Sequence, residues 1–274
     1  MDQNVEKNEN YLKTGMFYLG FTDNLYGALE NNIRERKADF SLDETRMFNN
    51  KEFDYKLNFR LKDPGGRYPY SLESYNVAFK DDPSHKTLVP LSNNRGITAK
   101  ESANLLMGLA VGKTTKRANV ESMTWTELDF DKKDPNGNLV MNNYGENYGF
   151  DMEMALKELE KITPDQQGFS QNDITNLKKG NLPDIVVMVK GKQQSGFLVA
   201  NPKERAIEVF NDKGELLIKQ AGLSEQRQDR VEQQARQPLK QAFVMNKLLE
   251  KTPRKPVPSL VIEGGETQKK GRKR

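Results

Sequence analysis

The chain has 274 residues, with 43 Lys and Arg, 39 Asp and Glu, a single His and no Cys. Apolar residues make up 35% of it, and no stretch approaches the ~18 consecutive apolar residues of a membrane-spanning helix. Without Cys there are no disulfides and no thiolate chemistry, and one His excludes most His-based catalysis and the common zinc sites. We expect a cytoplasmic α+β protein with no membrane partner, since the polar start MDQNVEKNEN lacks the apolar stretch of a signal peptide.

Residues 11–95 are predicted to form an N-terminal α+β part, preceded by disorder over residues 1–10. Apolar residues recur at helical spacing from Leu25 to Ile33, which indicates an amphipathic helix. From Phe53 to Leu61 apolar and polar residues alternate, a pattern typical of a strand with one buried face. A Pro-Gly-Gly turn and a return strand complete a hairpin, and a third strand is predicted at 87–91.

Residues 96–220 are predicted to alternate short helices with hairpins. Thr98 and Glu101 have the spacing of a capping box at the start of one helix. Asp151 is expected to cap a second helix, and Ser170 begins a third. The predicted strands span residues 122–130, 139–150, 184–190, 196–201, 205–211 and 216–218.

A short pattern recurs in this region at an offset of 72 residues. Asn104-Leu105 with Gly108 is repeated as Asn176-Leu177 with Gly180, each time ahead of an aromatic-led strand. A Gly at this place stops a helix in the left-handed conformation. The pattern predicts two copies of a helix-plus-hairpin module, over residues 98–150 and 170–218, although coincidence between short patterns is the alternative.

Positive charge gathers at the C-terminal end. Residues 221–251 are predicted to be a helical segment and residues 252–274, the basic tail, to be disordered. The tail holds seven basic residues against two acidic ones: Arg254, Lys255, Lys269, Lys270, Arg272, Lys273 and Arg274. We expect it to contact nucleic acid weakly, without sequence specificity and in a salt-dependent way; the alternative is a solubilising end.

Three carboxylates alternate along the strand predicted at 122–130 and just beyond it: Glu127, Asp129 and Asp131. Alternation places them on one face of a strand, where they could hold a hard cation such as Mg²⁺. The solvated side of an edge strand explains the same row. No catalytic set and no cofactor are predicted.

Aromatic residues and glycines are interleaved from Tyr144 through Tyr148 to Phe150. Such a strand can stack nucleobases, but stacking platforms normally lie beside Lys and Arg. Here the nearest charges are Glu146 and Asp151. We therefore predict an interior or interface role for the three aromatic side chains.

Two other patterns fail to match known sites. Gly112-Lys113-Thr114 suggests a phosphate-binding loop, but the first Gly of that motif is out of place and the context is wrong. The Asp and Asn residues of 129–138 fit neither register of an EF-hand calcium loop, and a polar hairpin turn accounts for them. His85 is expected to be an ordinary surface side chain.

Several blocks resemble a family of uncharacterised proteins carried on Bacteroidetes conjugative and mobilisable elements. The matching stretches within residues 15–215 include KESANLLMGLAVGK, ENYGFDMEMAL, LKKGNLPDIVVMV and ANPKERAIEVFND. The resemblance implies a genomic setting in which such blocks occur alone or attached to large DNA-processing proteins, often with basic C-termini. It implies no catalytic residue.

These observations predict a non-enzymatic binding or adaptor protein that contacts a protein partner of unknown identity. Two alternatives belong to other classes: a sequence-tolerant DNA or RNA binder in which the folded body takes part, and a metal-dependent enzyme that uses the strand carboxylates. The expected fold is α+β, with antiparallel hairpins, short packed helices and a two-fold internal repeat.

Overall fold

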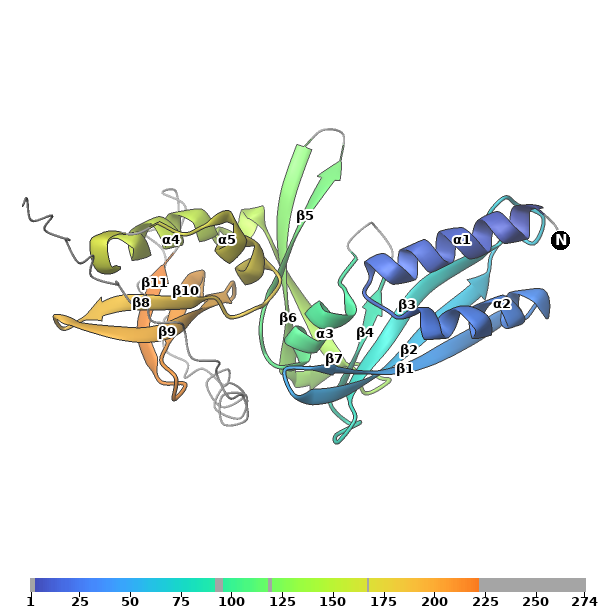
Figure 1. Cartoon of the computed structure of the whole chain (residues 1–274), viewed down its shortest axis with the longest axis horizontal. Coiled ribbons are helices and arrows are strands. Elements are labelled where there is room, and N and C mark those ends of the chain that lie inside the picture. Colours follow the sequence, from blue (N-terminus) through green and yellow to red (C-terminus); the bar gives the residue numbers. More distant parts are fainter. Residues whose placement is uncertain (1–2, 92–95, 118–119, 167, 222–274) are drawn as a thin grey trace, which may run out of the picture.

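The structure is a computed structural model that describes residues 3–91, 96–117, 120–166 and 168–221. These residues form five α-helices and eleven strands in three antiparallel sheets, which confirms the predicted α+β class with hairpins. The sheets follow one another along the length of the molecule (Figure 1). Within these ranges no helix is long and apolar enough to cross a membrane.

The first sheet has the strand order β1-β2-β3-β4. Its elements are α1 (Gln3–Tyr18), α2 (Tyr26–Arg34), β1 (Asp39–Phe48), β2 (Lys51–Leu61), β3 (Tyr70–Phe79) and β4 (Lys86–Pro90). The two helices lie over one face of the sheet (Figure 1). On that face the alternating residues Tyr55, Leu57 and Phe59 of β2 are fully buried, so the strand predicted here and its buried side are confirmed.

Helix α1 overturns the prediction that residues 1–10 are disordered, since residues 3–10 are helical and only 1–2 lie outside the description. The helix is held by polar contacts as well as by Leu12 and Met16. The Asn8 side chain is fully buried, donates to the carbonyl of Tyr70 (3.0 Å) and accepts from its N–H (2.8 Å). Residues 3–10 are mostly polar, and a buried amide helps to hold them on the sheet. They therefore lack the apolar periodicity from which helices are predicted.

The second and third sheets have the orders β5-β6-β7 and β11-β10-β9-β8. The remaining elements are α3 (Ala99–Leu106), β5 (Val111–Arg117), β6 (Val120–Lys133), β7 (Leu139–Gly145), α4 (Met152–Glu160), α5 (Gln171–Lys178), β8 (Asp184–Val189), β9 (Lys192–Asn201), β10 (Ala206–Phe210) and β11 (Leu216–Ala221).

The predicted helix starts are confirmed. The Thr98 and Glu101 side chains form the reciprocal bonds of a capping box, and Ser170 does the same with Asp173. The Asp151 side chain accepts from the N–H of residue 154 at the start of α4. Strand β7 stops at Gly145, where the prediction ran on to residue 150, because a 3₁₀ turn follows. Strands β1 and β5 had not been predicted.

We call each sheet with its preceding helix a unit, numbered in chain order. The offset of 72 residues also relates the strands of the second and third units. Gly112 pairs with Trp125 in β5 and β6, and 72 residues later Asp184 pairs with Phe197 in β8 and β9. Gly108 and Gly180 both adopt positive φ, +82° and +70°. In both helices this Gly donates to the carbonyl three residues earlier, at 2.9 and 3.0 Å. The two copies therefore share their helix end and their hairpin register.

The same helix end occurs a third time, 72 residues before Gly108. Arg36 has φ of +56° and donates to the carbonyl of Ile33 at 3.0 Å, and Lys37 donates to that of Asn32 at 3.2 Å. The bonds match those after α3 and α5 and form a Schellman motif. The molecule is thus three helix-plus-antiparallel-sheet units in a row, where the sequence indicated two copies.

The second and third units meet at their helix ends. Asn104, at the end of α3, is buried, and its amide donates to the carbonyl of Lys179 at the end of α5 (2.8 Å). Gly180 lies against this contact, so a Cβ there would be 3.0 Å from the carbonyl oxygen of Ala110. The predicted helical segment at 221–251 and the basic tail follow this unit; Ala221 is the last residue of β11, and residues 222–274 lie outside the described residues.

Candidate functional site

The structure places the three carboxylates of the predicted metal row on β6 but does not bring them together. Glu127 is buried, Asp129 is half-buried and Asp131 is exposed. The pairing of β6 with β7 shifts register between Asp129 and Lys133. In this bulge the N–H of Asp131 donates to the Asp129 carboxylate (3.0 Å). Over the described ranges no three His, Cys, Asp or Glu side chains converge on one point.

Glu127 instead belongs to a polar cluster with Tyr144 of β7 and Tyr148 of the 3₁₀ turn that follows β7. The Tyr144 hydroxyl donates to Oε1 of Glu127 at 2.6 Å, and the Tyr144 and Tyr148 rings are 4.6 Å apart. Arg205, from the turn between β9 and β10, donates to the Tyr148 carbonyl at 2.8 Å. Its guanidinium carbon lies 4.3 Å from the centre of the Tyr148 ring, a cation–π distance.

This cluster joins the second unit to the third. The Tyr148 hydroxyl donates to the carbonyl of Lys203, in the same turn as Arg205 (2.8 Å). Phe150 packs against Trp125 with ring centres 5.4 Å apart. Tyr144, Tyr148 and Phe150 are thus positioned where two units of the same chain meet.

Burial dominates the electrostatics of Glu127. It raises the pKa of the carboxyl above its ordinary value of 4.5, against the opposing effects of the Tyr144 hydrogen bond and of Lys203. Oε2 has no hydrogen-bond partner among the described residues. Burial and the bond to Glu127 likewise raise the pKa of Tyr144, so this hydroxyl remains a donor. A carboxylate held in this way makes stability depend on pH.

We expect Glu127→Gln to flatten that dependence. In the wild type the folded state holds the proton to higher pH than the unfolded state, so the free energy of unfolding falls as pH rises from 4.5 through the raised pKa. Gln accepts from Tyr144 and does not ionise, so this fall should shrink. Urea unfolding between pH 4.5 and 7.5 measures it, with exposed Glu153→Gln as the matched control. Equal pH dependence in Glu127→Gln and wild type would contradict the assignment.

The motifs that failed as sites in the sequence have structural roles. Lys113 is on β5, and its Nζ lies 2.6 and 2.7 Å from the carboxylate oxygens of Glu101, the capping-box residue of α3. Asp134 accepts from the backbone of its own turn, at residues 136 and 138. His85 lies against Phe79 and Phe130 and is half-buried rather than an open surface residue. This burial lowers its pKa.

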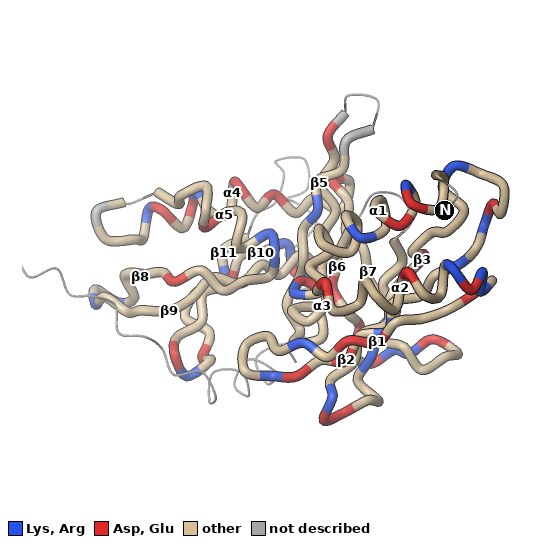
Figure 2. Tube along the Cα trace, turned by 45° about the vertical axis from the view of Figure 1, so that its right-hand side comes forward, with Lys and Arg blue, Asp and Glu red and all other residues tan. Residues whose placement is uncertain are grey.

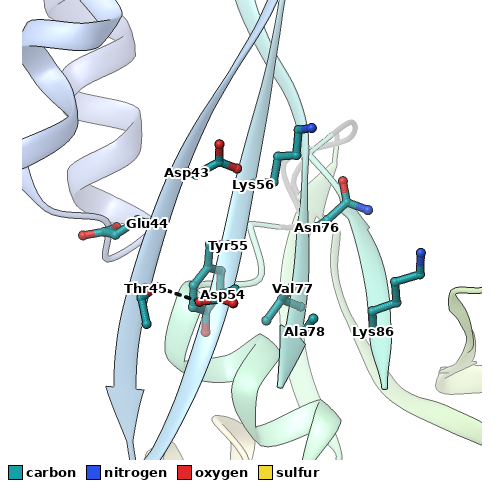
Figure 3. A pocket seen from close by; sticks show the side chains of 10 residues that line it. All are labelled: Asp43, Glu44, Thr45, Asp54, Tyr55, Lys56, Asn76, Val77, Ala78 and Lys86. Carbon is teal, nitrogen blue, oxygen red and sulfur yellow. Dashed lines mark hydrogen bonds between the residues drawn. The ribbon is translucent and has the colours of Figure 1, made fainter. Parts of the chain in front are cut away.

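The face of the first sheet opposite the helices is a broad polar surface, which we call the open face. Figure 3 shows its centre, where Asp43, Lys56, Asn76 and Lys86 come from four successive strands. They line a shallow depression of about 460 Å³. A second depression of about 520 Å³ lies around Asn58 and extends along β1, β2 and β3.

Charges of both signs are interleaved on the open face. Arg60 pairs with Asp39 at 2.9 Å, and Thr45 donates to Asp54 at 2.6 Å. Along the described part of the chain, basic and acidic residues are interspersed (Figure 2). The alternation along β2 predicted that one side of this strand faces solvent. Asn76 and Lys86 belong to the same face because β3 pairs with β2 and β4 pairs with β3, which the alternation does not show.

The protein is thus an α+β chain of three helix-plus-sheet units, and the first sheet has one face that is polar and not covered by helices. No family model, curated protein or solved structure matches the chain. The seven basic residues of the tail lie outside the described residues.

Proposed function

We propose that the protein is a non-enzymatic binding or adaptor protein that recognises a protein partner through the open face of its first sheet. The resemblance noted above supports a setting on a mobile genetic element, and the composition supports a cytoplasmic location. The basic tail adds weak contact with nucleic acid.

The mixed charge of the open face is the observation that carries the proposal. Nucleic-acid interfaces present clustered positive charge to phosphates. Here Lys56 and Lys86 share one depression with Asp43 and Asp54. Interleaved charges over a wide, shallow surface suit another protein surface, where complementary charges fix register and exclude wrong partners. The three units have the helix end in common, and the second and third also share their strand pairing. These shared features are part of the scaffold and do not form a binding site.

A photo-crosslinker on the open face tests the proposal. The chain has no Cys, so Lys56→Cys carries one benzophenone label on this face, and Lys157→Cys, exposed on α4, carries the matched control label. In host extract we expect a discrete protein adduct from position 56 only, and we expect excess unlabelled chain to remove it. Identical adducts from both positions, or none from position 56, would contradict the proposal.

The sequence-tolerant nucleic-acid binder stays as a second candidate because Lys56, Arg60 and Lys86 are all on the open face. The two candidates differ in which basic residues would bind. Under the adaptor proposal the tail alone contacts nucleic acid, while under the alternative these three side chains contribute.

Replacing the seven basic tail residues by Gln in the full chain is expected to remove nucleic-acid binding. Seven contacts to single-stranded DNA give a salt slope of about −5, which is about a thousandfold loss of affinity between 50 and 200 mM salt. Fluorescence anisotropy with a labelled 30-mer measures both effects. The matched control exchanges Lys for Arg and Arg for Lys at the same positions and should bind as the wild type does. Weakened binding in Lys56→Gln/Arg60→Gln/Lys86→Gln, with the tail intact, would favour the second candidate.

A further inference from the structure

Helix α1 carries an aromatic surface on the side that faces away from the sheet. Tyr11, Phe17 and Tyr18 are 63%, 67% and 75% exposed, and Tyr68, from the loop between β2 and β3, is 45% exposed. The Tyr11 and Tyr68 rings are 5.1 Å apart, and those of Phe17 and Tyr18 are 5.7 Å apart. Single exposed aromatic residues are common, but three on one helix with a fourth from a neighbouring loop mark an interaction site.

The opposite side of α1 is fully used by the fold. Asn8, Leu12 and Met16 are buried against the sheet, so the helix cannot turn its aromatic residues inward. Tyr11 and Tyr18 are seven residues apart, which places them on one stripe two turns from each other. Gly15 lies between them, and a Cβ built on it would meet nothing within 4 Å. The stripe thus has two large ends and a hollow centre.

Charge around the stripe does not favour a polyanion. Glu6 and Lys7 are both exposed near its start. Lys13 is paired with Glu30 at 2.5 Å, and the Arg67 guanidinium lies over the Tyr68 ring at 5.5 Å. A partner for this surface therefore needs aromatic or apolar side chains rather than phosphates.

We propose that α1 binds α1 of a second copy of this chain, antiparallel, about a two-fold axis at Thr14 and Gly15. In this arrangement Tyr11 of one copy meets Tyr18 of the other, twice, and the two Gly15 residues let the helix backbones approach. The stripe is self-complementary because its large residues are equidistant from its centre, which is what an isologous contact requires. This inference does not depend on the proposed binding function.

The exposed aromatic area is sufficient for a weak dimer. At about 200 Å² for a whole aromatic side chain, the exposed parts of Tyr11, Tyr18 and Tyr68 amount to about 370 Å² per copy, or about 730 Å² for the pair. Phe17 is about 110° around the helix from this stripe and is not counted. The total is below about 1,000 Å², where specific interfaces begin, and suits a weak, transient contact. The contact is therefore expected to be concentration-dependent.

Single-cysteine crosslinking of the full chain tests the geometry. Only residues at the two-fold axis meet their own copy, so Gly15→Cys should form a disulfide-linked dimer under mild oxidation. Lys7→Cys is the matched control on the same stripe. It lies eight residues from Gly15, roughly 12 Å along the helix and roughly 24 Å from its own copy, too far for a disulfide, which needs Cα atoms within about 7 Å.

Sedimentation velocity between 1 and 200 µM gives the second readout. Wild type should shift towards the dimer with concentration, and Tyr18→Lys should raise the dissociation constant at least tenfold and prevent the Gly15→Cys crosslink. Tyr18 is largely exposed, so an unchanged circular dichroism spectrum and urea midpoint will show that this variant is folded. A wild-type chain that stays monomeric at 200 µM, or equal crosslinking of Lys7→Cys and Gly15→Cys, would overturn the proposal.

Discussion

Asn8→Ala is expected to lower the free energy of unfolding by about 3 kcal/mol, because both hydrogen bonds of a buried amide disappear and leave their backbone partners without water. The partners are the N–H and the carbonyl of Tyr70. Strand β4 pairs with β3 only over residues 74–78 and does not reach Tyr70. The Asn8 side chain therefore replaces a neighbouring strand at this edge.

Urea unfolding followed by circular dichroism measures this loss. Asn10→Ala is the matched control, since Asn10 is on the same helix but exposed, and it should change stability by less than about 0.5 kcal/mol. If Asn8→Ala and Asn10→Ala unfold at the same urea concentration, α1 is not held by this amide.

Gly196→Ala is expected to be as damaging, at about 3 kcal/mol, although it adds one methyl group. A Cβ at Gly196 would lie 2.3 Å from the carbonyl oxygen of Phe210. The obstacle is the backbone of the paired strand β10, which no side-chain rotation can remove. The two strands must separate locally, and the core on both faces of the third sheet loses contact with them.

The matched control is Gly145→Ala, at the end of β7, where an added Cβ meets nothing within 4 Å. It should leave the thermal midpoint nearly unchanged, while Gly196→Ala lowers it by more than 5 °C. Similar midpoints for the two variants would show that β9 moves away from β10 at little cost.

Much of the fold could be predicted from local signals. Some signals depend only on residues close in sequence, so they can be recognised without the structure. They are the alternation from Phe53 to Leu61 and the helix caps at Thr98 and Ser170. Strand β1 was missed because its exposed and half-buried residues follow no simple alternation. The third copy of the helix end was missed because Arg36 stands where the other copies have Gly, and a positive φ is not expected of Arg.

The candidate surfaces were harder to predict. The open face joins side chains from four strands, so its composition depends on the order and register of strands from β1, which carries Asp43, to β4, which carries Lys86. Glu127 appeared as one of three acidic residues in a row, whereas its actual partner, Tyr144, comes from the neighbouring strand. The aromatic stripe of α1 was not predicted because the sequence indicated no helix before Leu25, and Tyr11 and Tyr18 share a stripe only when the residues between them are helical.

The recurrence of one helix end at intervals of 72 residues bears on how such a chain can change length. Each copy stops its helix with bonds among its own residues, and each hairpin sets its own pairing. A change of a few residues inside a copy would break its helix end or its hairpin. Gain or loss of an entire copy would keep those local bonds but would remove contacts that join the units, such as those of Asn104 with Lys179 and of Tyr148 with Lys203. A change in length by whole copies therefore requires new junctions between the units that remain.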